Sequence, residues 1–162
     1  MSSYNICKKS AQDIGWINTL MIENWGSDRV VLQGRIYHPA ELDAFIAEQN
    51  RERIGLITYI MDRKICEIIT LNSLQPGLGV GTALMDAVKQ AAEAAGCDAL
   101  ILFTTNDNIN GLKFYQKYGF YLEELIKDGV LSDRKLKPEI PLKAENGISI
   151  QDYLLLKLRL KP

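Results

Sequence analysis

The sequence predicts a single mixed α/β domain, and three observations lead to that class. The chain has 162 residues, which is the usual length of one domain. Hydrophobic residues make up 47% of it, enough to form a buried core. Apolar runs of strand character alternate along the chain with segments whose apolar residues recur at helical spacing. We therefore expect residues 1–162 to form one unit.

The first fifty residues are expected to open with a strand and a helix. Residues 4–8 fit a short strand, and the apolar side chains of residues 11–25 recur near helical spacing. Residues 39–49 fit a short amphipathic helix or a mobile segment. A strand followed by a helix is consistent with the mixed class.

Two apolar strands come next and are expected to form the centre of the sheet. Residues 54–61 and 65–71 are both strongly apolar. The polar connection Asp62-Arg63-Lys64 between them is typical of an antiparallel hairpin. A carboxylate, Glu67, lies inside the second of these runs. Partial burial there would raise its pKa toward the range that is useful for a general base.

Three alternating glycines, Gly77, Gly79 and Gly81, lie between the second strand and an alanine-rich helical segment. Glycine has no Cβ, so the backbone can turn sharply and its N–H groups can approach an anion closely. The positive end of the helix dipole faces the same point. The pattern predicts a phosphate cradle that would fit a diphosphate, although tight packing alone could also explain it.

Two common nucleotide-binding motifs do not match this loop. A Walker loop needs a lysine before its Ser or Thr, but Gly81 is followed directly by Thr82. A dinucleotide loop needs a third glycine three residues after Gly79, and Thr82 is there instead. The next strand, residues 99–103, also lacks the expected acidic residue at its end. Nucleotide hydrolysis and dinucleotide binding are therefore disfavoured.

The second half of the chain predicts two helices and three strands. After the glycines, apolar residues line one face of a helix that Gly96 ends. A strand over 99–103, a helix over 108–118 and a strand over 120–126 follow. The last strand covers 153–160, where apolar and polar residues alternate near its end, which indicates one solvated face. Residues 127–151 carry many charges, two glycines and two prolines, and no helix or strand is predicted there.

Composition excludes several classes of partner. The net charge is −1, which argues against a nucleic-acid-binding surface. Cys7, Cys66 and Cys97 form no C-x-x-C pair and His38 is the only histidine, so we expect reduced thiols and no metal site. We see no signal peptide and no apolar run near the roughly 18 residues of a membrane span. The sequence thus predicts a cytoplasmic protein without a membrane partner.

Residues 108–120 read Asn-Ile-Asn-Gly-Leu-Lys-Phe-Tyr-Gln-Lys-Tyr-Gly-Phe. This segment resembles the second signature of the GNAT superfamily of acyl-CoA-dependent N-acetyltransferases: an asparagine, a small residue, Phe-Tyr and then Gly-Phe. Asn108 falls where the family has its cofactor-side asparagine, and Gly111 falls where it usually has alanine. Tyr115 falls where the family has the tyrosine beside the thioester sulfur.

The glycine loop resembles the family's other signature, Gln/Arg-x-x-Gly-x-Gly/Ala, with Gly79 and Gly81 as its glycines. One position departs from it. Pro76 occupies the leading Gln/Arg position, and Gln75 comes one residue early. Because proline has no N–H, the cradle would depend on the amides of residues 78–82. The two signatures together cover residues 65–125.

The resemblance implies the GNAT fold, an α/β (α+β) arrangement with a central twisted sheet. The sheet would be mixed but mostly antiparallel, with six to seven strands flanked by about four helices. It implies acetyl-CoA as cosubstrate and direct transfer of the acetyl group to a primary amine. The backbones of Leu71 and Ser73 would pair with the pantetheine arm like an added strand, and Asn108 would lie on the cofactor side. The pyrophosphate would be bound by Leu78, Gly79, Val80, Gly81, Thr82, Ala83 and Leu84.

Candidate catalytic groups follow from this chemistry. The departing thiolate needs a proton, and Tyr115 would donate it as general acid; without the motif, Tyr115 would read as a core aromatic. The amine must lose a proton, and Glu67 is similar in placement to the general base of the histone acetyltransferases. Two alternatives stay open. Glu67 could instead be an exposed residue on the outer face of its strand, or ordered water could carry the proton away from the amine. The N–H of Leu71 would polarise the thioester carbonyl.

The acceptor is left open, as a small-molecule or a peptide amine. Residues 25–39 and 127–151 would wall its cleft. The second segment is basic through Arg134, Lys135, Lys137 and Lys143, which fits a solvated charge run or, as the alternative, an anionic acceptor. The alternative to an enzyme is a non-catalytic CoA-binding regulatory module, which Pro76 would favour. A homodimer is also conceivable, with the last strand pairing across a two-fold axis.

Overall fold

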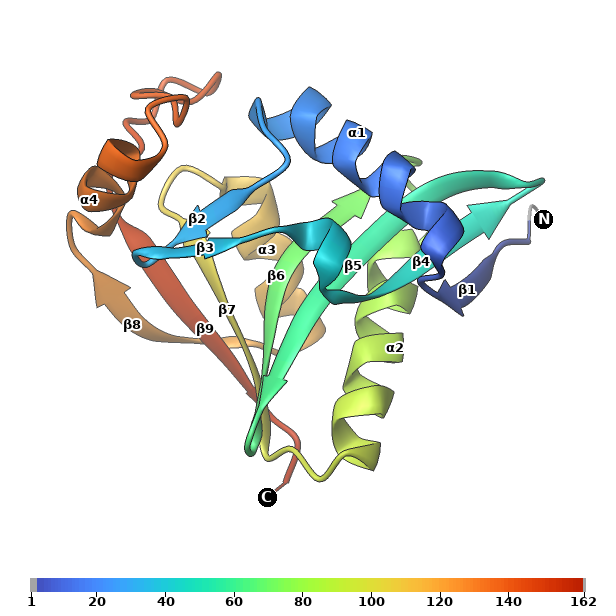
Figure 1. Cartoon of the computed structure of the whole chain (residues 1–162). Helices are drawn as coiled ribbons and strands as arrows, with labels where there is room; N and C mark the ends of the chain where they lie inside the picture. The colour runs from blue at the N-terminus through green and yellow to red at the C-terminus, as the bar shows by residue number, and fades with distance from the viewer. Residues whose placement is uncertain (1–2, 162) are drawn as a thin grey trace.

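A computed structural model describes residues 3–161, shown in Figure 1. One seven-stranded sheet has the order β1-β4-β5-β6-β7-β9-β8, and β2 and β3 form a separate hairpin. Only β6 and β7 pair in parallel; the other neighbours are antiparallel. The strands are β1 (Asn5–Lys8), β2 (Val30–Leu32), β3 (Arg35–Tyr37), β4 (Asp43–Gln49), β5 (Glu52–Asp62), β6 (Ile65–Ser73), β7 (Ala99–Thr105), β8 (Tyr121–Ile126) and β9 (Tyr153–Arg159). The mixed, mostly antiparallel sheet confirms the predicted fold class.

Helices cover both faces of the sheet (Figure 1). Helices α2 and α3 pack on one face, and α1, α4 and the β2–β3 hairpin lie on the other. The α-helices are α1 (Ile14–Trp25), α2 (Val80–Ala94), α3 (Ile109–Tyr118) and α4 (Gly129–Leu136), and the short 3-10 helices are Ala11–Asp13 and Pro39–Glu41. In residues 3–161 no helix is both long and apolar enough to cross a membrane.

The packing of α2 fixes the position of the glycine loop. Val80, Leu84, Val88 and Ala92 recur every four residues and are at most 1% exposed, so they form the face that lies on the sheet. Gly55 of β5 allows the start of α2 to approach closely. A Cβ at Gly55 would lie 2.6 Å from Cγ1 of Val80, which is too close for any other residue type without movement.

The sheet splits between β6 and β7. Their pairing runs from Ile65↔Ala99 to Ile68↔Leu102 and then stops, although β6 continues to Ser73 and β7 to Thr105. Within residues 3–161, no strand pairs with the β6 backbone beyond Ile68 on the β7 side. The two strand ends diverge and leave an opening in the sheet.

Three expectations about single segments are wrong. Residues 39–49 form a 3-10 turn and strand β4, because Ala44, Ile46 and Ala47 are buried when β4 pairs between β1 and β5. Residues 127–151 contain a helix, α4, held by tertiary contacts of Asp133. The last strand cannot pair with a second copy, since β9 lies inside the sheet between β7 and β8.

Candidate active site

The N-terminus of α2 is open to an anion. Gly79 caps it with a φ of +74°, a left-handed conformation that favours glycine, and no side chain satisfies the first turn. The first helical hydrogen bond runs from Ala83 N–H to the Gly79 carbonyl at 3.0 Å. The N–H groups of Val80, Gly81 and Thr82 therefore have no acceptor in the helix. These N–H groups and the helix dipole make this helix terminus suitable for an anion such as a phosphate group.

Contacts from distant parts of the chain hold this loop. The Tyr4 hydroxyl donates to the Leu78 carbonyl at 3.1 Å, and the Leu74 N–H donates to the Ile54 carbonyl at 2.8 Å. A Cβ at Gly81 would lie 3.4 Å from Cζ of Phe114. Helix α3 thus packs directly against the first turn of α2, and Phe114 is the neighbour of Tyr115.

Asn108 caps α3 and ties it to β7. Its Oδ1 accepts from the Gly111 N–H at 3.1 Å, and its Nδ2 donates to the Thr104 hydroxyl at 2.9 Å. A Cβ at Gly111 would lie 2.2 Å from Nδ2 of Asn108, so glycine at this position leaves room for the cap. Both ends of the Asn108 amide are thus engaged within the protein, and the residue also lines the central cleft.

A cleft of about 660 Å³ occupies the opening between β6 and β7. Tyr115 of α3 lines it together with Leu71 of β6 and Thr104 and Asn108 from the end of β7. The outer walls come from both segments that were expected to form them. Their lining residues are Trp25, Gly26, Val30, Val31 and Leu32 from one, and Val130, Lys137, Glu139, Ile140, Pro141, Ala144 and Ile150 from the other.

Tyr115 is half-buried and lies among aromatic rings. Its ring meets those of Phe114 and Phe120 edge-on, with centroids 5.5 and 6.0 Å away. Burial raises the pKa of the Tyr115 phenol to about 12. The phenol therefore keeps its proton at any physiological pH and can act as a hydrogen-bond and proton donor in the cleft.

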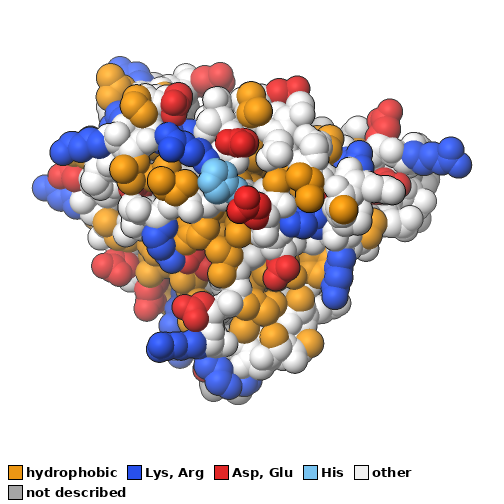
Figure 2. Space-filling model, viewed as in Figure 1, with side chains coloured by type: hydrophobic (Ala, Val, Ile, Leu, Met, Phe, Trp, Pro, Cys, Tyr) orange, Lys and Arg blue, Asp and Glu red, His pale blue; other side chains and the backbone are white. Residues whose placement is uncertain are grey.

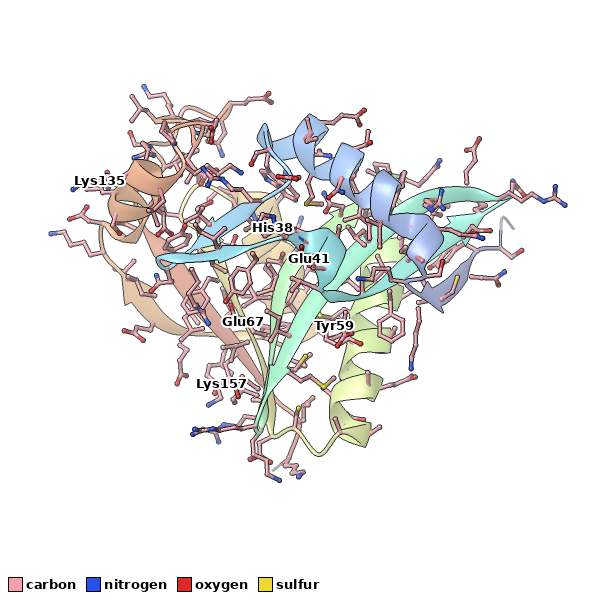
Figure 3. The ribbon with its side chains drawn as sticks, viewed as in Figure 1. His38, Glu41, Tyr59, Glu67, Lys135 and Lys157 are labelled. Atoms are coloured by element: carbon pink, nitrogen blue, oxygen red, sulfur yellow. The ribbon has the colours of Figure 1, made fainter. Side chains whose placement is uncertain are left out.

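Glu67 does not share this cleft with Tyr115. It lines a second cavity, on the other side of the β2–β3 hairpin, with Arg35, Tyr37 and Ile101. Glu67 is 8% exposed, and its Oε1 accepts from the Arg35 guanidinium at 3.1 Å. Burial raises the pKa of Glu67 while Arg35 opposes that rise. In Figure 3 Glu67 lies on the sheet face that also carries Lys157, two strands away.

The remaining predicted cofactor residues cluster at one end of the split. Ser73 ends β6, two residues beyond Leu71, and the loop from Leu78 leads into the first turn of α2. Within that turn Val80 and Leu84 point into the core, at 1% and 0% exposure, so only their backbone is available to a ligand. His38, by contrast, is exposed on the face shown in Figure 2.

A buried carboxylate that the sequence did not single out holds the wall of the cleft. Asp133 of α4 is fully buried and accepts three hydrogen bonds. They come from the N–H groups of Gln33 and Gly34, at 2.8 and 2.7 Å, and from the Tyr153 hydroxyl at 2.7 Å. Gln33 and Gly34 both have positive φ and form the tight turn between β2 and β3. Asp133 thereby connects the β2–β3 hairpin to α4 and β9.

Replacing Asp133 with asparagine should destabilise the protein by about 2 kcal/mol or more. The amide nitrogen of asparagine would face the backbone N–H of Gln33 or of Gly34. Two hydrogen-bond donors would then oppose each other in the interior, and neither would have an acceptor. Chemical denaturation measures the free energy of unfolding. Tyr153→Phe is the matched control, because it removes one donor only and should cost about 1 kcal/mol. Equal stability of Asp133→Asn and wild type would contradict this role.

The basic residues of the outer wall are largely used within the protein. Arg134 donates to the carbonyls of Ile140, Pro141 and Ile150. Lys137 is 4% exposed, and its Nζ donates to the Arg29 carbonyl at 2.9 Å. Burial lowers the pKa of Lys137. These two cations therefore fix the fold of the wall, which neither of the sequence interpretations of this basic segment anticipated.

Sequence reasoning also missed Arg35, Gly55 and Asp107. Arg35 and Gly55 act through partners far away in the sequence, Glu67 and Val80, and no local pattern reports them. Asp107 did carry a signal, since it directly precedes Asn108 in the matched motif and follows the strand that ends at the cleft.

The site combines a helix terminus with free N–H groups, a strand edge without a partner in residues 3–161 and a cleft lined by the half-buried Tyr115. Such an arrangement can hold a phosphate-bearing acyl donor beside an acceptor, and this defines an acyltransferase domain. The model of the acetyltransferase (GNAT) family matches residues 12–120. The chain belongs to that family.

Relatives and solved structures agree with this assignment. The chain is 42% identical over 141 residues to the uncharacterized protein YxbD of Bacillus subtilis (strain 168), covering 86% of this chain and 89% of that protein. An IAA acetyltransferase from Bacillus cereus ATCC 14579 has a TM-score of 0.72 at 21% identity, over 97% of this chain and 99% of that one. A GNAT family acetyltransferase from Elizabethkingia anophelis with acetyl-CoA bound has a TM-score of 0.68 at 22% identity, over 96% and 97% of the two chains. These two structures share the fold.

Proposed function

We propose that this protein transfers an acetyl group from acetyl-CoA, its cosubstrate, to the primary amine of a small molecule or peptide. One observation carries the proposal: the free N–H groups at the start of α2 and Tyr115 lie on adjoining helices, and Tyr115 lines the cleft between β6 and β7. The first can bind the pyrophosphate, and the second reaches the cleft in which the thioester would meet the amine. The unpaired edge of β6 at Leu71 and Ser73 can receive the pantetheine arm.

The reaction proceeds by direct attack in this scheme. The acceptor ammonium first loses a proton, because a protonated nitrogen has no lone pair. The amine then attacks the thioester carbonyl, forming the C–N bond, and the N–H of Leu71 stabilises the charge on the oxygen. The C–S bond breaks, and CoA leaves as a thiolate that takes the Tyr115 proton. Tyr115 is reprotonated by the proton that the new amide nitrogen releases, so the sum is amide, free CoA and one proton.

Water is the proton acceptor that we favour for the ammonium. Glu67 lines the other cavity and is held by Arg35, which supports a positioning role for the β2–β3 hairpin.

Pro76 does not weaken the cradle in this scheme. It lies outside the first turn of α2, and the three free N–H groups belong to residues after it. The open cleft beside Tyr115 favours an enzyme over a non-catalytic CoA-binding module.

Glu67→Gln tests the choice of base. We expect kcat to fall by less than about tenfold, since a lost general base costs about 10²-fold or more. We also expect the pH profile of kcat/KM to keep its shape. If Glu67 were a general base with a raised pKa, kcat/KM would increase as the pH rises through that pKa. Glutamine would then remove this rising limb of the pH profile. Loss of the limb, together with a drop of about 10²-fold, would identify Glu67 as the base.

The proposed activity itself is tested by following free thiol released from acetyl-CoA in the presence of a panel of amines. Amine-dependent release, with the acetylated product seen by mass spectrometry, is the expected result. Binding of acetyl-CoA without turnover of any amine would favour the non-catalytic module instead. The oligomeric state can be measured on the same samples by light scattering; the homodimer remains a prediction.

A further inference from the structure

We propose that the acceptor is an apolar amine without an acidic group and that the carboxylate of Asp107 binds its ammonium. This inference rests on the proposed function, because it names the class of acceptor for the same cleft. It assigns a specificity role to a residue outside the cofactor-binding and proton-transfer groups described above.

The walls of the cleft indicate that the acceptor has an apolar body. The apolar residues Trp25, Leu32, Phe103, Val130 and Ile140 line it, from α1, β2, β7, α4 and the segment after α4. A volume of about 660 Å³ lies within the range of small-molecule sites. Contact with a strongly hydrated acceptor contributes little binding free energy at apolar side chains. Contact with an aromatic or branched aliphatic group, which displaces water from them, contributes more.

Asp107 supplies a carboxylate, whose negative charge complements an ammonium group. It follows β7 at the split in the sheet, directly before Asn108, and lines the cleft. Its Oδ1 is buried without any hydrogen-bond partner in the described part of the chain. A buried acceptor left unpaired costs free energy, and an ammonium donor would recover it with a charge-assisted hydrogen bond.

The backbone around Asp107 is fixed by two asparagines. The Nδ2 of Asn146 donates to the Asp107 carbonyl at 2.9 Å. Next to it, Oδ1 of Asn106 accepts from the N–H groups of Gln151 and Asp152, at 3.1 and 3.0 Å. The backbone of Asp107 is thus held where β7, α3 and the outer wall meet, which fixes the point from which its side chain extends.

The charges of the cleft disfavour an acidic acceptor. Of residues 3–161, Lys137 is the one cation that lines the cleft, and its Nζ already donates to the Arg29 carbonyl. Two carboxylates, Asp107 and Glu139, line the same cleft. The carboxylate of an amino acid would meet these two acids, and the one cation, Lys137, is only 4% exposed, so repulsion and desolvation would oppose its binding. An amine without an acidic group carries only a positive charge, which the two carboxylates of the cleft complement.

The test measures amine binding through tryptophan fluorescence. Trp25 lines the cleft, so a Trp16→Phe background leaves it as the single reporter. Phenethylamine, phenylalanine and phenethyl alcohol are titrated with and without bound CoA. We expect phenethylamine to bind about tenfold more tightly than the other two. Phenylalanine binding as tightly as phenethylamine, or no binding of phenethylamine in either state, would overturn the proposal.

Asp107→Asn keeps the shape of the side chain and removes its charge. We expect it to weaken phenethylamine binding about tenfold and to leave phenethyl alcohol binding as it was. Asp98→Asn is the matched control, because Asp98 is exposed and pairs with Lys161 outside the cleft. Unchanged phenethylamine affinity in a folded Asp107→Asn protein would overturn the assignment. Should this variant not fold, the three-ligand comparison in the parent protein decides alone. Calorimetry with acetyl-CoA judges the proposed function separately, since it does not depend on the amine.

Discussion

Tyr115→Phe is expected to lower kcat by about 10²- to 10⁴-fold, the usual contribution of a positioned general acid. The phenylalanine ring would keep the contacts with Phe114 and Phe120, so only the proton donor is lost. The affinity for acetyl-CoA should stay within about twofold, because the proposed pyrophosphate contacts lie on α2. Steady-state kinetics with the best amine of the panel, and calorimetry with acetyl-CoA, measure the two quantities.

Tyr118→Phe provides the control on the same helix. The Tyr118 hydroxyl donates to Asp86 of α2 at 2.6 Å and does not line the cleft, so kcat should be little affected. The pH profile adds a second check. Because the pKa of Tyr115 is raised to about 12, its deprotonation should not cause an alkaline decline below that pH. A kcat for Tyr115→Phe close to that of wild type would exclude the acid role.

Gly79→Val should reduce acetyl-CoA affinity by about 10²-fold or more, since several charge-assisted hydrogen bonds depend on this turn. A β-branched residue strongly disfavours the φ of +74° found here, so the turn would move and its N–H groups with it. The added side chain would also occupy space beside the first turn of α2. Calorimetric titration with acetyl-CoA gives the affinity directly.

Gly96→Val separates the loss of the cradle from backbone strain. Gly96 follows the other end of α2, has a similar φ of +81° and has no atom within 4 Å of an added Cβ. Both variants should lose about 1–2 kcal/mol of stability from the left-handed conformation. Only Gly79→Val should lose affinity. Equal affinities in the two variants would mean that the ligand does not bind at this helix terminus.

The parts of the fold that the sequence predicted are those with local signals. The spacing of Ala83, Leu84 and Val88 defined one face of α2, and Gly96 marked the turn that follows it. The order of the glycine loop and the Asn108 to Phe120 motif gave the family, which the match to residues 12–120 confirms. Local periodicity and short motifs carry this information because it lies within a few residues of chain.

Elements that depend on distant partners were missed or misassigned. Residues 39–49 were interpreted as a short helix or a mobile segment, and most of them form strand β4 because β1 and β5 supply hydrogen-bonding partners on both sides. The β2–β3 hairpin and α4 depend on each other through Asp133, about 100 residues from the hairpin. No window of sequence contains both.

The candidate site shows the same limit. Tyr115 and the glycines were placed by motif, but the sequence could not show that the cavity lined by Glu67 is separate from that of Tyr115. It also could not show that Arg134 and Lys137 are used by backbone carbonyls of the wall. Side-chain direction and partner choice are properties of the tertiary structure, so the basic character of residues 127–151 did not describe the cleft.

The most direct test of the account is a calorimetric titration of the protein with acetyl-CoA, run beside ATP and NAD at the same salt concentration. We expect saturable binding of acetyl-CoA with one site per chain and much weaker binding of the two nucleotides. Absence of acetyl-CoA binding, or equal binding of ATP or NAD, would contradict the assignment of the α2 terminus and β6 edge to the cosubstrate.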